Sequence, residues 1–252
     1  MSRALSSELL KLRTTRTFYA LVGSALGLVL LIVCVAAATG DWTYGPGDTP
    51  PGLDLLGVAA IAQLFAVVLG ILAVTSEFRH GTITPSLLVV PSRERLLSSK
   101  LIVHLLAGLL FGILTVLLTL VLSALIFSLR DIETGLDAAN VIKTGGGTAL
   151  SIAFYATLGV GIGAVVRNQV GAIVGTLAYL FVIESLLTII PGLDDAISKF
   201  GLNGVASGLA NSDFGGDTDT LAQIPAGLLL LAYCALFAIA GAVLLKRRDI
   251  SA

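Results

Sequence analysis

Apolar residues fill six long stretches of the chain, separated by short polar segments. The stretches cover residues 18–38, 55–76, 101–129, 149–166, 170–190 and 224–245. At about 1.5 Å per helical residue, each is about long enough to cross a hydrocarbon layer of roughly 30 Å, the fourth being the shortest. The pattern therefore predicts an all-α polytopic membrane protein with six transmembrane helices.

Before the first stretch, Leu5, Leu9 and Leu12 recur at helical spacing. The charged residues beside that apolar face are Glu8, Lys11, Arg13 and Arg16. This arrangement predicts a short amphipathic helix within residues 1–17, lying on the membrane surface with its basic side chains near anionic headgroups. A simple basic anchor explains the pattern nearly as well.

The longest segment outside the apolar stretches, residues 191–223, is rich in Gly, Asn, Asp and Ser. Its apolar residues return at roughly helical spacing: Leu193, Ile197, Phe200, Val205 and Leu209. One or two short helices on the outer interface are predicted, with a plain loop as the alternative. So little chain lies outside the helices that residues 1–252 are expected to form a single membrane domain.

Composition agrees with a lipid environment. Hydrophobic residues make up 56% of the chain and charged residues only 12%, whereas soluble domains carry roughly a quarter charged residues. The net charge of −1 gives no indication of a nucleic-acid partner, because charges of opposite sign lie on opposite sides of the membrane.

The distribution of basic residues predicts an orientation. Twelve of the fifteen Lys and Arg residues fall at one set of helix ends, leaving Arg130, Lys143 and Lys199 at the other. By the positive-inside rule, both termini are expected in the cytoplasm and the protein in the cell membrane.

Four stretches carry glycines spaced by four residues. The pairs are Gly23 and Gly27, Gly108 and Gly112, Gly159 and Gly163, and Gly171 and Gly175. Small residues let helix backbones approach closely in lipid, so these faces are predicted to be helix contacts.

The segment 77–100, between the second and third stretches, is the strongest functional signal. Its apolar residues, Leu87 to Val90, lie between Pro85 and Pro91 and between two charged clusters. Thr84 is suited to cap a short helix that Pro91 ends, which would expose Leu87 and Leu88 as a partner-binding patch. Alternatively, the flanking charges, Arg95 and Lys100 especially, only hold the topology and contact headgroups.

This segment resembles the membrane subunits of the ABC-2 family of ATP-binding-cassette exporters. The matching residues are Glu77, Arg79, Gly81, Thr82, Pro91, Arg93 and Lys100. The resemblance extends to the amphipathic start with Glu8 and Lys11 and to the six spans. It implies that residues 77–100 form a coupling helix that docks into an ATPase subunit. The resemblance also implies a complex of two ATPase subunits and two permease subunits, the second permease being identical or related.

Nucleotide chemistry is not expected in this chain. None of its five lysines follows a glycine, so the phosphate-binding G-x-x-x-x-G-K-[ST] loop is missing. No cofactor or metal is expected here, and ATP and Mg²⁺ are assigned to the partner. His80 is expected on the loop surface, and His104 in a hydrogen bond between helices.

Glu184 is the single acidic residue within an apolar stretch. Such a group is expensive in lipid unless it faces a cavity or finds a partner, so Glu184 is a candidate for the substrate path together with Tyr155 and Tyr179. Snorkelling or a bond to a nearby hydroxyl is the alternative. The mild polarity of this path favours an amphiphilic or lipophilic cargo, with a drug or antibiotic as the expected example.

Three functions remain open from the sequence. The first is the permease subunit of an exporter driven by a separate ATPase. The second is a secondary transporter built from two inverted three-helix repeats and driven by an ion gradient. The third is an immunity or sensor protein that transports nothing.

Overall fold

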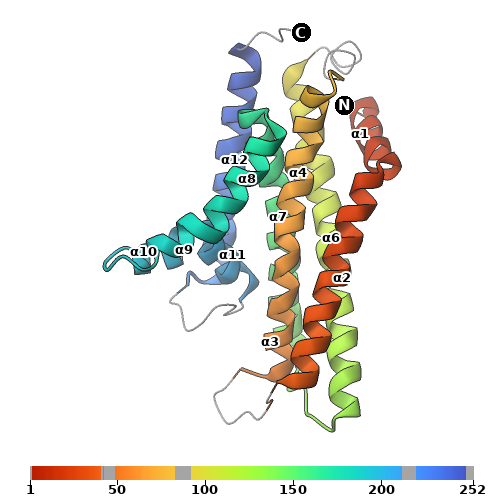
Figure 1. The fold of residues 1–252 in the computed structure, drawn as a ribbon, viewed down its shortest axis with the longest axis vertical. Coiled ribbons are helices and arrows are strands. Elements are labelled where there is room, and N and C mark those ends of the chain that lie inside the picture. Colours follow the sequence, from red (N-terminus) through yellow and green to blue (C-terminus); the bar gives the residue numbers. More distant parts are fainter. Residues whose placement is uncertain (1, 41, 43–48, 83–91, 212–219, 248–252) are drawn as a thin grey trace.

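The computed structural model describes residues 2–40, 42, 49–82, 92–211 and 220–247, and these residues contain helices but no strands. Six helical segments are long and apolar enough to span a membrane (Figure 1). They are Arg16–Thr39, Pro51–Arg79, Arg93–Leu129, Ala138–Val166, Gln169–Leu187 and Gln223–Lys246. The predicted all-α membrane fold with six transmembrane helices is therefore confirmed.

Two of these segments are composite. The second consists of α3 (Pro51–Val58), a 3-10 turn η1 (Ala59–Ile61) and α4 (Ala62–Arg79). The fifth consists of α8 (Gln169–Ala178), a π-helical turn η2 (Tyr179–Ile183) and α9 (Glu184–Leu187). The other four spans are single helices: α2 (Arg16–Thr39), α6 (Arg93–Leu129), α7 (Ala138–Val166) and α12 (Gln223–Arg247). The short α1 (Ser2–Thr14) lies at the same end of the bundle as the end of α4 (Figure 1).

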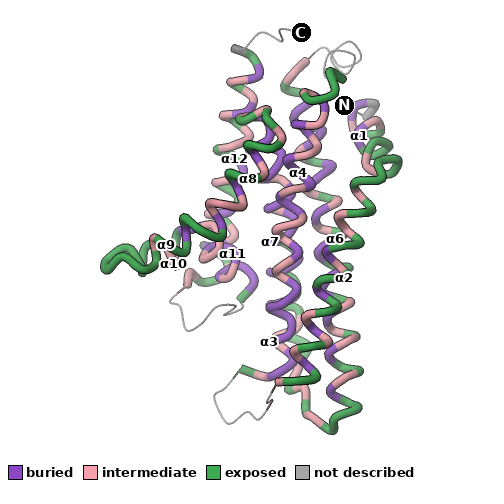
Figure 2. Tube along the Cα trace, viewed as in Figure 1, coloured by how far each residue is buried: buried purple, intermediate pink, exposed green. Residues whose placement is uncertain are grey.

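Helix α7 forms the centre of the bundle. It packs against α4, α6 and α12 (Figure 2). In an apolar stretch of 18 residues, 72% of the residues of α7 are buried, compared with 17% in the fifth span. Large apolar side chains are exposed on α2, α6, α8 to α9 and α12, as expected of helices that face lipid.

Glycines allow α7 to approach its neighbours closely. A β-carbon at Gly159 would overlap the Val67 carbonyl oxygen of α4, and one at Gly112 would lie 2.7 Å from the Ala149 Cα. The pairs at 108/112 and 159/163 are thus helix contacts, as predicted. The prediction is wrong within this chain for the pairs at 23/27 and 171/175, because no other described helix lies against them.

The fourth span begins earlier than the apolar pattern predicts. It starts at Ala138 rather than at residue 149, because the Asp137 carboxylate accepts the Asn140 backbone N–H at 2.7 Å and caps the helix. Its polar first turns lead into a glycine run in which Gly147 packs against the Leu209 carbonyl oxygen.

The helices predicted within residues 191–223 are present. They are α10 (Asp194–Phe200) and α11 (Leu202–Ala210). Helix α11 packs against α7 and α12 and buries Val205 and Leu209, so it folds back onto the bundle. Its predicted position at the outer interface stays a prediction.

Candidate functional site

The end of α4 shows why the sequence has a glycine at position 81. Gly81 adopts a left-handed conformation with φ of 65°, which strains residues that carry a β-carbon. The Thr82 N–H donates to the Glu77 carbonyl oxygen at 2.9 Å, and the Gly81 N–H donates to the Phe78 carbonyl oxygen at 3.4 Å. These bonds form a Schellman motif that ends the helix and turns the chain away from α4.

The chain returns to the bundle at α6. The Ser92 hydroxyl accepts the Arg95 backbone N–H and caps this helix, and the Arg93 guanidinium donates to the Leu245 carbonyl oxygen near the end of α12. Segment 77–100 is therefore helical at both of its ends. The predicted apolar helix between them, with Leu87, Leu88 and Pro91, lies outside the described residues and stays a prediction.

Other basic side chains at this end join neighbouring helices. The Arg79 guanidinium donates to the Gln169 side-chain oxygen of α8 at 3.2 Å. The Arg167 guanidinium donates to the Leu244 carbonyl oxygen at 2.7 Å and lies 5.1 Å from the centre of the Phe78 ring. Guanidinium groups at the end of α12 also interact favourably with the negative end of its dipole.

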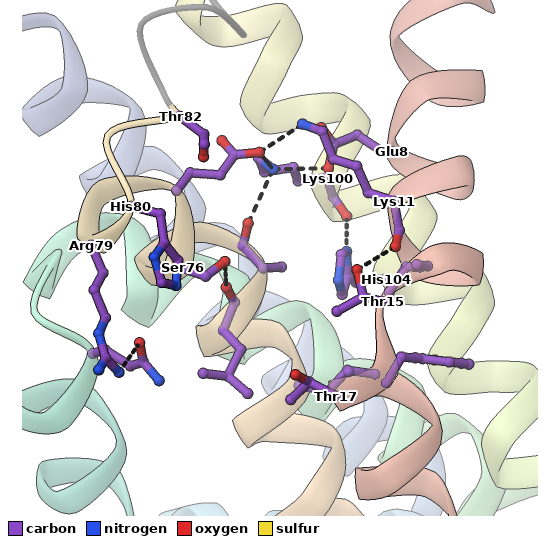
Figure 3. Close-up of a pocket in the computed structure, with 17 residues that line it drawn as sticks. Glu8, Lys11, Thr15, Thr17, Ser76, Arg79, His80, Thr82, Lys100 and His104 are labelled. Carbon is purple, nitrogen blue, oxygen red and sulfur yellow. Dashed lines mark hydrogen bonds and ion pairs between the residues drawn. The ribbon is translucent and has the colours of Figure 1, made fainter.

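Four charged side chains from three helices meet beside the end of α4 (Figure 3). We call them the charge cluster: Glu8 and Lys11 of α1, Glu77 of α4 and Lys100 of α6. The Lys100 ammonium lies 2.8 Å from a Glu8 oxygen and 2.7 Å from a Glu77 oxygen. The Lys11 ammonium lies 2.7 Å from an oxygen of each carboxylate. The four charges thus alternate and sum to zero.

The charge cluster is mostly buried. The Lys100 side chain is 4% exposed and that of Glu8 3%, while Lys11 is 44% exposed at the edge. The alternative that Lys100 contacts headgroups is therefore wrong, because two carboxylates and the Ala73 carbonyl oxygen surround its ammonium. The prediction that Glu8 lies beside the apolar face of α1 is also wrong. Glu8 lies on the buried face of α1, whereas Leu9 is exposed.

The two histidines differ in their surroundings. His80 follows the end of α4 and is exposed, as predicted. His104 is buried, and its Nδ1 hydrogen-bonds the Lys100 carbonyl oxygen at 2.9 Å within the same helix. The predicted bond between helices is absent among the described residues.

Electrostatics favours the charged form of Glu8. Burial alone would raise the pKa of Glu8, but the attraction and hydrogen bonds of Lys100 and Lys11 outweigh it, so the pKa of Glu8 lies below its ordinary value of 4.5. For Lys11, burial lowers the pKa, but the hydrogen bonds and charges of Glu77 and Glu8 raise it above its ordinary value of 10.5. Both shifts stabilise the docked position of α1 at neutral pH.

The depressed pKa of Glu8 leads to a pH prediction. The stabilisation that Glu8 contributes is complete above pH 4.5 and is lost as the pH falls through its folded-state pKa. Backbone amides of α1 should therefore exchange hydrogen faster at pH 3.5 to 4 than at pH 7, after correction for intrinsic rates. The measurement is hydrogen exchange by mass spectrometry in nanodiscs. Glu8→Gln should remove the pH dependence, and a protected α1 in the unmodified protein at pH 3.5 would contradict the prediction.

Glu184 holds the hairpin of α10 and α11 against the fifth span. One of its carboxylate oxygens accepts the Asn203 backbone N–H of α11 at 2.7 Å, and the Asn203 amide donates to the Leu180 carbonyl oxygen of η2 at 2.8 Å. Among the described residues, the second carboxylate oxygen has no hydrogen-bond partner. Glu184 thus caps α11 from a neighbouring helix.

The two tyrosines of the predicted substrate path lie near this hairpin. The Tyr155 hydroxyl donates to the Leu202 carbonyl oxygen at 2.9 Å, and its ring is fully buried. Tyr179 lines a mainly apolar cavity of about 450 Å³ between α7, α8, α11 and α12, together with Thr176 and Tyr233. Tyr155 and Glu184 do not line that cavity, so the three residues share a region but not one surface.

Some residues of this site were not assigned to it by sequence reasoning. Arg167 and Gln169 join the helices at this end. Lys100 was matched to the family motif, but its ion pairs with Glu8 and Glu77 were not predicted. The sequence contains one signal for these ion pairs. Lys100 directly precedes a long apolar stretch, and two glutamates, Glu8 and Glu77, lie in other segments at the same end.

Comparison with known proteins agrees with these features. A family model described as "ABC-2 family transporter protein" matches residues 4–183, from α1 to η2. A search of curated proteins finds no significant match. The chain belongs to the ABC-2 family of transporter proteins, and is thus a multi-pass membrane component of an ABC transporter that works with ATPase subunits.

Proposed function

We propose that the chain is the permease subunit of an exporter, with both termini and segment 77–100 in the cytoplasm. The end of α4, the start of α6 and the whole of α1 lie at one end of the bundle, together with most of the basic residues (Figure 1). The positive-inside rule assigns such an end to the cytoplasm. ATP and Mg²⁺ would bind only to the partner ATPase.

The observation that supports this proposal most strongly is the charge cluster. Glu77 lies at the end of α4 and Lys100 near the start of α6, so the chain leaves and re-enters the bundle beside buried ion pairs. Glu8 adds α1 to the same unit through Lys100. A force applied to residues 83–91 by an ATPase would therefore move α1, α4 and α6 together instead of bending one of them.

Two ATPase subunits and a second permease would complete the transporter. No described helix lies against the glycine pair at 23/27 on α2, whereas the pair at 171/175 on α8 lines the cavity beside Tyr179. Faces of small residues are where transmembrane helices pack closely, so the 23/27 face suits a second permease subunit, identical or related.

The cargo in this proposal is an amphiphilic or lipophilic molecule, such as a drug or antibiotic. The cavity beside Tyr179 is largely apolar and has two tyrosines and Thr176 as its polar groups. Glu184 and Tyr155 hold the adjoining hairpin, so they would act on this path by positioning α11.

The docking role can be tested by substitution at two positions of segment 77–100. Gly81→Arg would strain the left-handed turn and place bulk and charge at the docking surface, and Leu88→Asp would add charge to the predicted apolar patch. Each variant should retain at most about a tenth of the ATPase that the unmodified permease retains on pull-down from native membranes, since charge in an apolar contact costs more than 1.4 kcal/mol.

Gly192→Arg is the matched control, because Gly192 also has a positive φ, 87°, and open space around it but follows the fifth span. It should retain the ATPase fully. Undiminished association in both Gly81→Arg and Leu88→Asp would refute the docking role. Transport in vesicles that persists without ATP and stops when the ion gradient is removed would favour a secondary transporter.

A further inference from the structure

A second cavity lies beside the charge cluster, at the end of the bundle where α4 ends (Figure 3). Its volume is about 550 Å³, within the usual range for small-ligand sites. Residues from α1, α2, α4, α6 and α8 line it. Nothing in the proposed transport path uses this cavity.

The lining changes from apolar to polar along α4. Leu69 and Leu72 contribute the apolar part, together with Phe18 from the start of α2. Arg79 and His80 lie about 11 to 16 Å further along the helix axis, at its exposed end. A ligand that fills this cavity must therefore be amphiphilic, with its polar group at the end of α4.

The charged side chains that line the cavity include one more cation than anions. The four members of the charge cluster neutralise one another. Arg79 is bonded to the neutral Gln169 side chain, and no carboxylate pairs with it among the described residues. The polar end of the cavity thus offers a guanidinium to an anionic group, and guanidinium binds phosphate in a bidentate geometry.

The same cavity also contains two buried acceptors that lack a donor. The second carboxylate oxygen of Glu77 and Nε2 of His104 have no hydrogen-bond partner among the described residues. The Glu77 residue is 6% exposed and His104 2%. Because Nδ1 of His104 donates to a carbonyl oxygen, Nε2 of the neutral ring is an acceptor. Buried polar atoms are rarely left unsatisfied, so the ligand should carry a hydrogen-bond donor as well as an anion.

We propose that this cavity binds a phospholipid whose headgroup carries N–H or O–H donors. Its phosphate pairs with Arg79, its headgroup donor bonds Glu77 or His104, and an acyl chain lies along Leu69 and Leu72. Phosphatidylethanolamine and phosphatidylglycerol meet these requirements. Phosphatidylcholine has the same phosphate and chains, but its quaternary ammonium has no N–H to donate.

Native mass spectrometry tests the proposal with purified protein and equimolar mixtures of the three lipids. The unmodified protein should retain phosphatidylethanolamine or phosphatidylglycerol about tenfold more than phosphatidylcholine, which corresponds to one hydrogen bond to a charged group. Arg79→Gln should reduce retention of all three lipids. His104→Phe, which keeps the ring but removes the acceptor, should reduce the discrimination more than the total retention.

Arg95→Gln is the matched control, because Arg95 is exposed at the start of α6 and does not line the cavity. It should leave both retention and discrimination unchanged. Equal retention of phosphatidylethanolamine, phosphatidylglycerol and phosphatidylcholine would overturn the proposal, as would unchanged retention in Arg79→Gln. Soluble glycerophosphoethanolamine that competes as well as the lipid would exclude the acyl-chain contact. None of these results depends on whether an ATPase docks at segment 77–100.

Discussion

Lys100→Met should destabilise the folded protein by about 3 to 5 kcal/mol, the usual cost of removing one partner from a buried ion pair. The substitution keeps an unbranched side chain that is one atom shorter, but it leaves Glu8 and Glu77 with only the half-exposed Lys11 to balance them. Two carboxylates would then repel each other in a buried site. The measurement is a denaturant titration of the reversible unfolding of the protein in detergent micelles.

Lys246→Met is the control for this loss. Lys246 also pairs with a glutamate, Glu94, at the same end of the bundle, but both side chains are 58% exposed. Exposed ion pairs contribute little, so the control should unfold like the original protein. Neutralising the whole charge cluster (Glu8→Gln, Lys11→Met, Glu77→Gln, Lys100→Met) should recover much of the loss. A Lys100→Met protein as stable as the control would show that these ion pairs do not hold α1, α4 and α6 together.

Gly159→Ala is expected to have the second large effect, a destabilisation of about 1 to 3 kcal/mol or more. The added β-carbon would overlap the Val67 carbonyl oxygen and lie 3.0 Å from the Ile71 nitrogen, both in the backbone of α4. The backbone of α4 is held by hydrogen bonds within its own helix, so it cannot shift locally. Helices α4 and α7 would therefore have to separate. Folded yield and the unfolding midpoint measure the effect.

The control for Gly159→Ala lies in the same helix. A β-carbon at Gly146 meets nothing within 4 Å, so Gly146→Ala should be neutral or slightly stabilising, since alanine favours helix more than glycine. Equal stability of the two variants would mean that α4 and α7 do not approach each other as closely as the structure has them.

The spans were predictable from sequence because their signal is local. Apolar length decides that a segment crosses lipid, and this criterion found all six helices. The start of the fourth span was missed because Lys143 and the glycines that follow it are typical of a loop. The helix forms there because of the Asp137 cap and the close packing of Gly147 against α11.

Contacts between helices were harder to predict. The four glycine pairs have the same spacing, yet among the described helices only two of them lie against another one, since spacing does not identify the opposite surface. Glu8 was placed on the flank of α1 because it is charged, but its partner Lys100 is 92 positions away in the chain. No local pattern relates two such residues.

The central position of α7 has a consequence for how the protein is made. Helices α2, α4 and α6 precede α7 in the chain, and α4 and α6 are two of the three elements against which it packs most extensively. Because synthesis proceeds from the N-terminus, these neighbours are already available when the ribosome delivers the fourth span. The interior of the subunit can therefore close during translation, and the last two spans insert beside a bundle that has already formed.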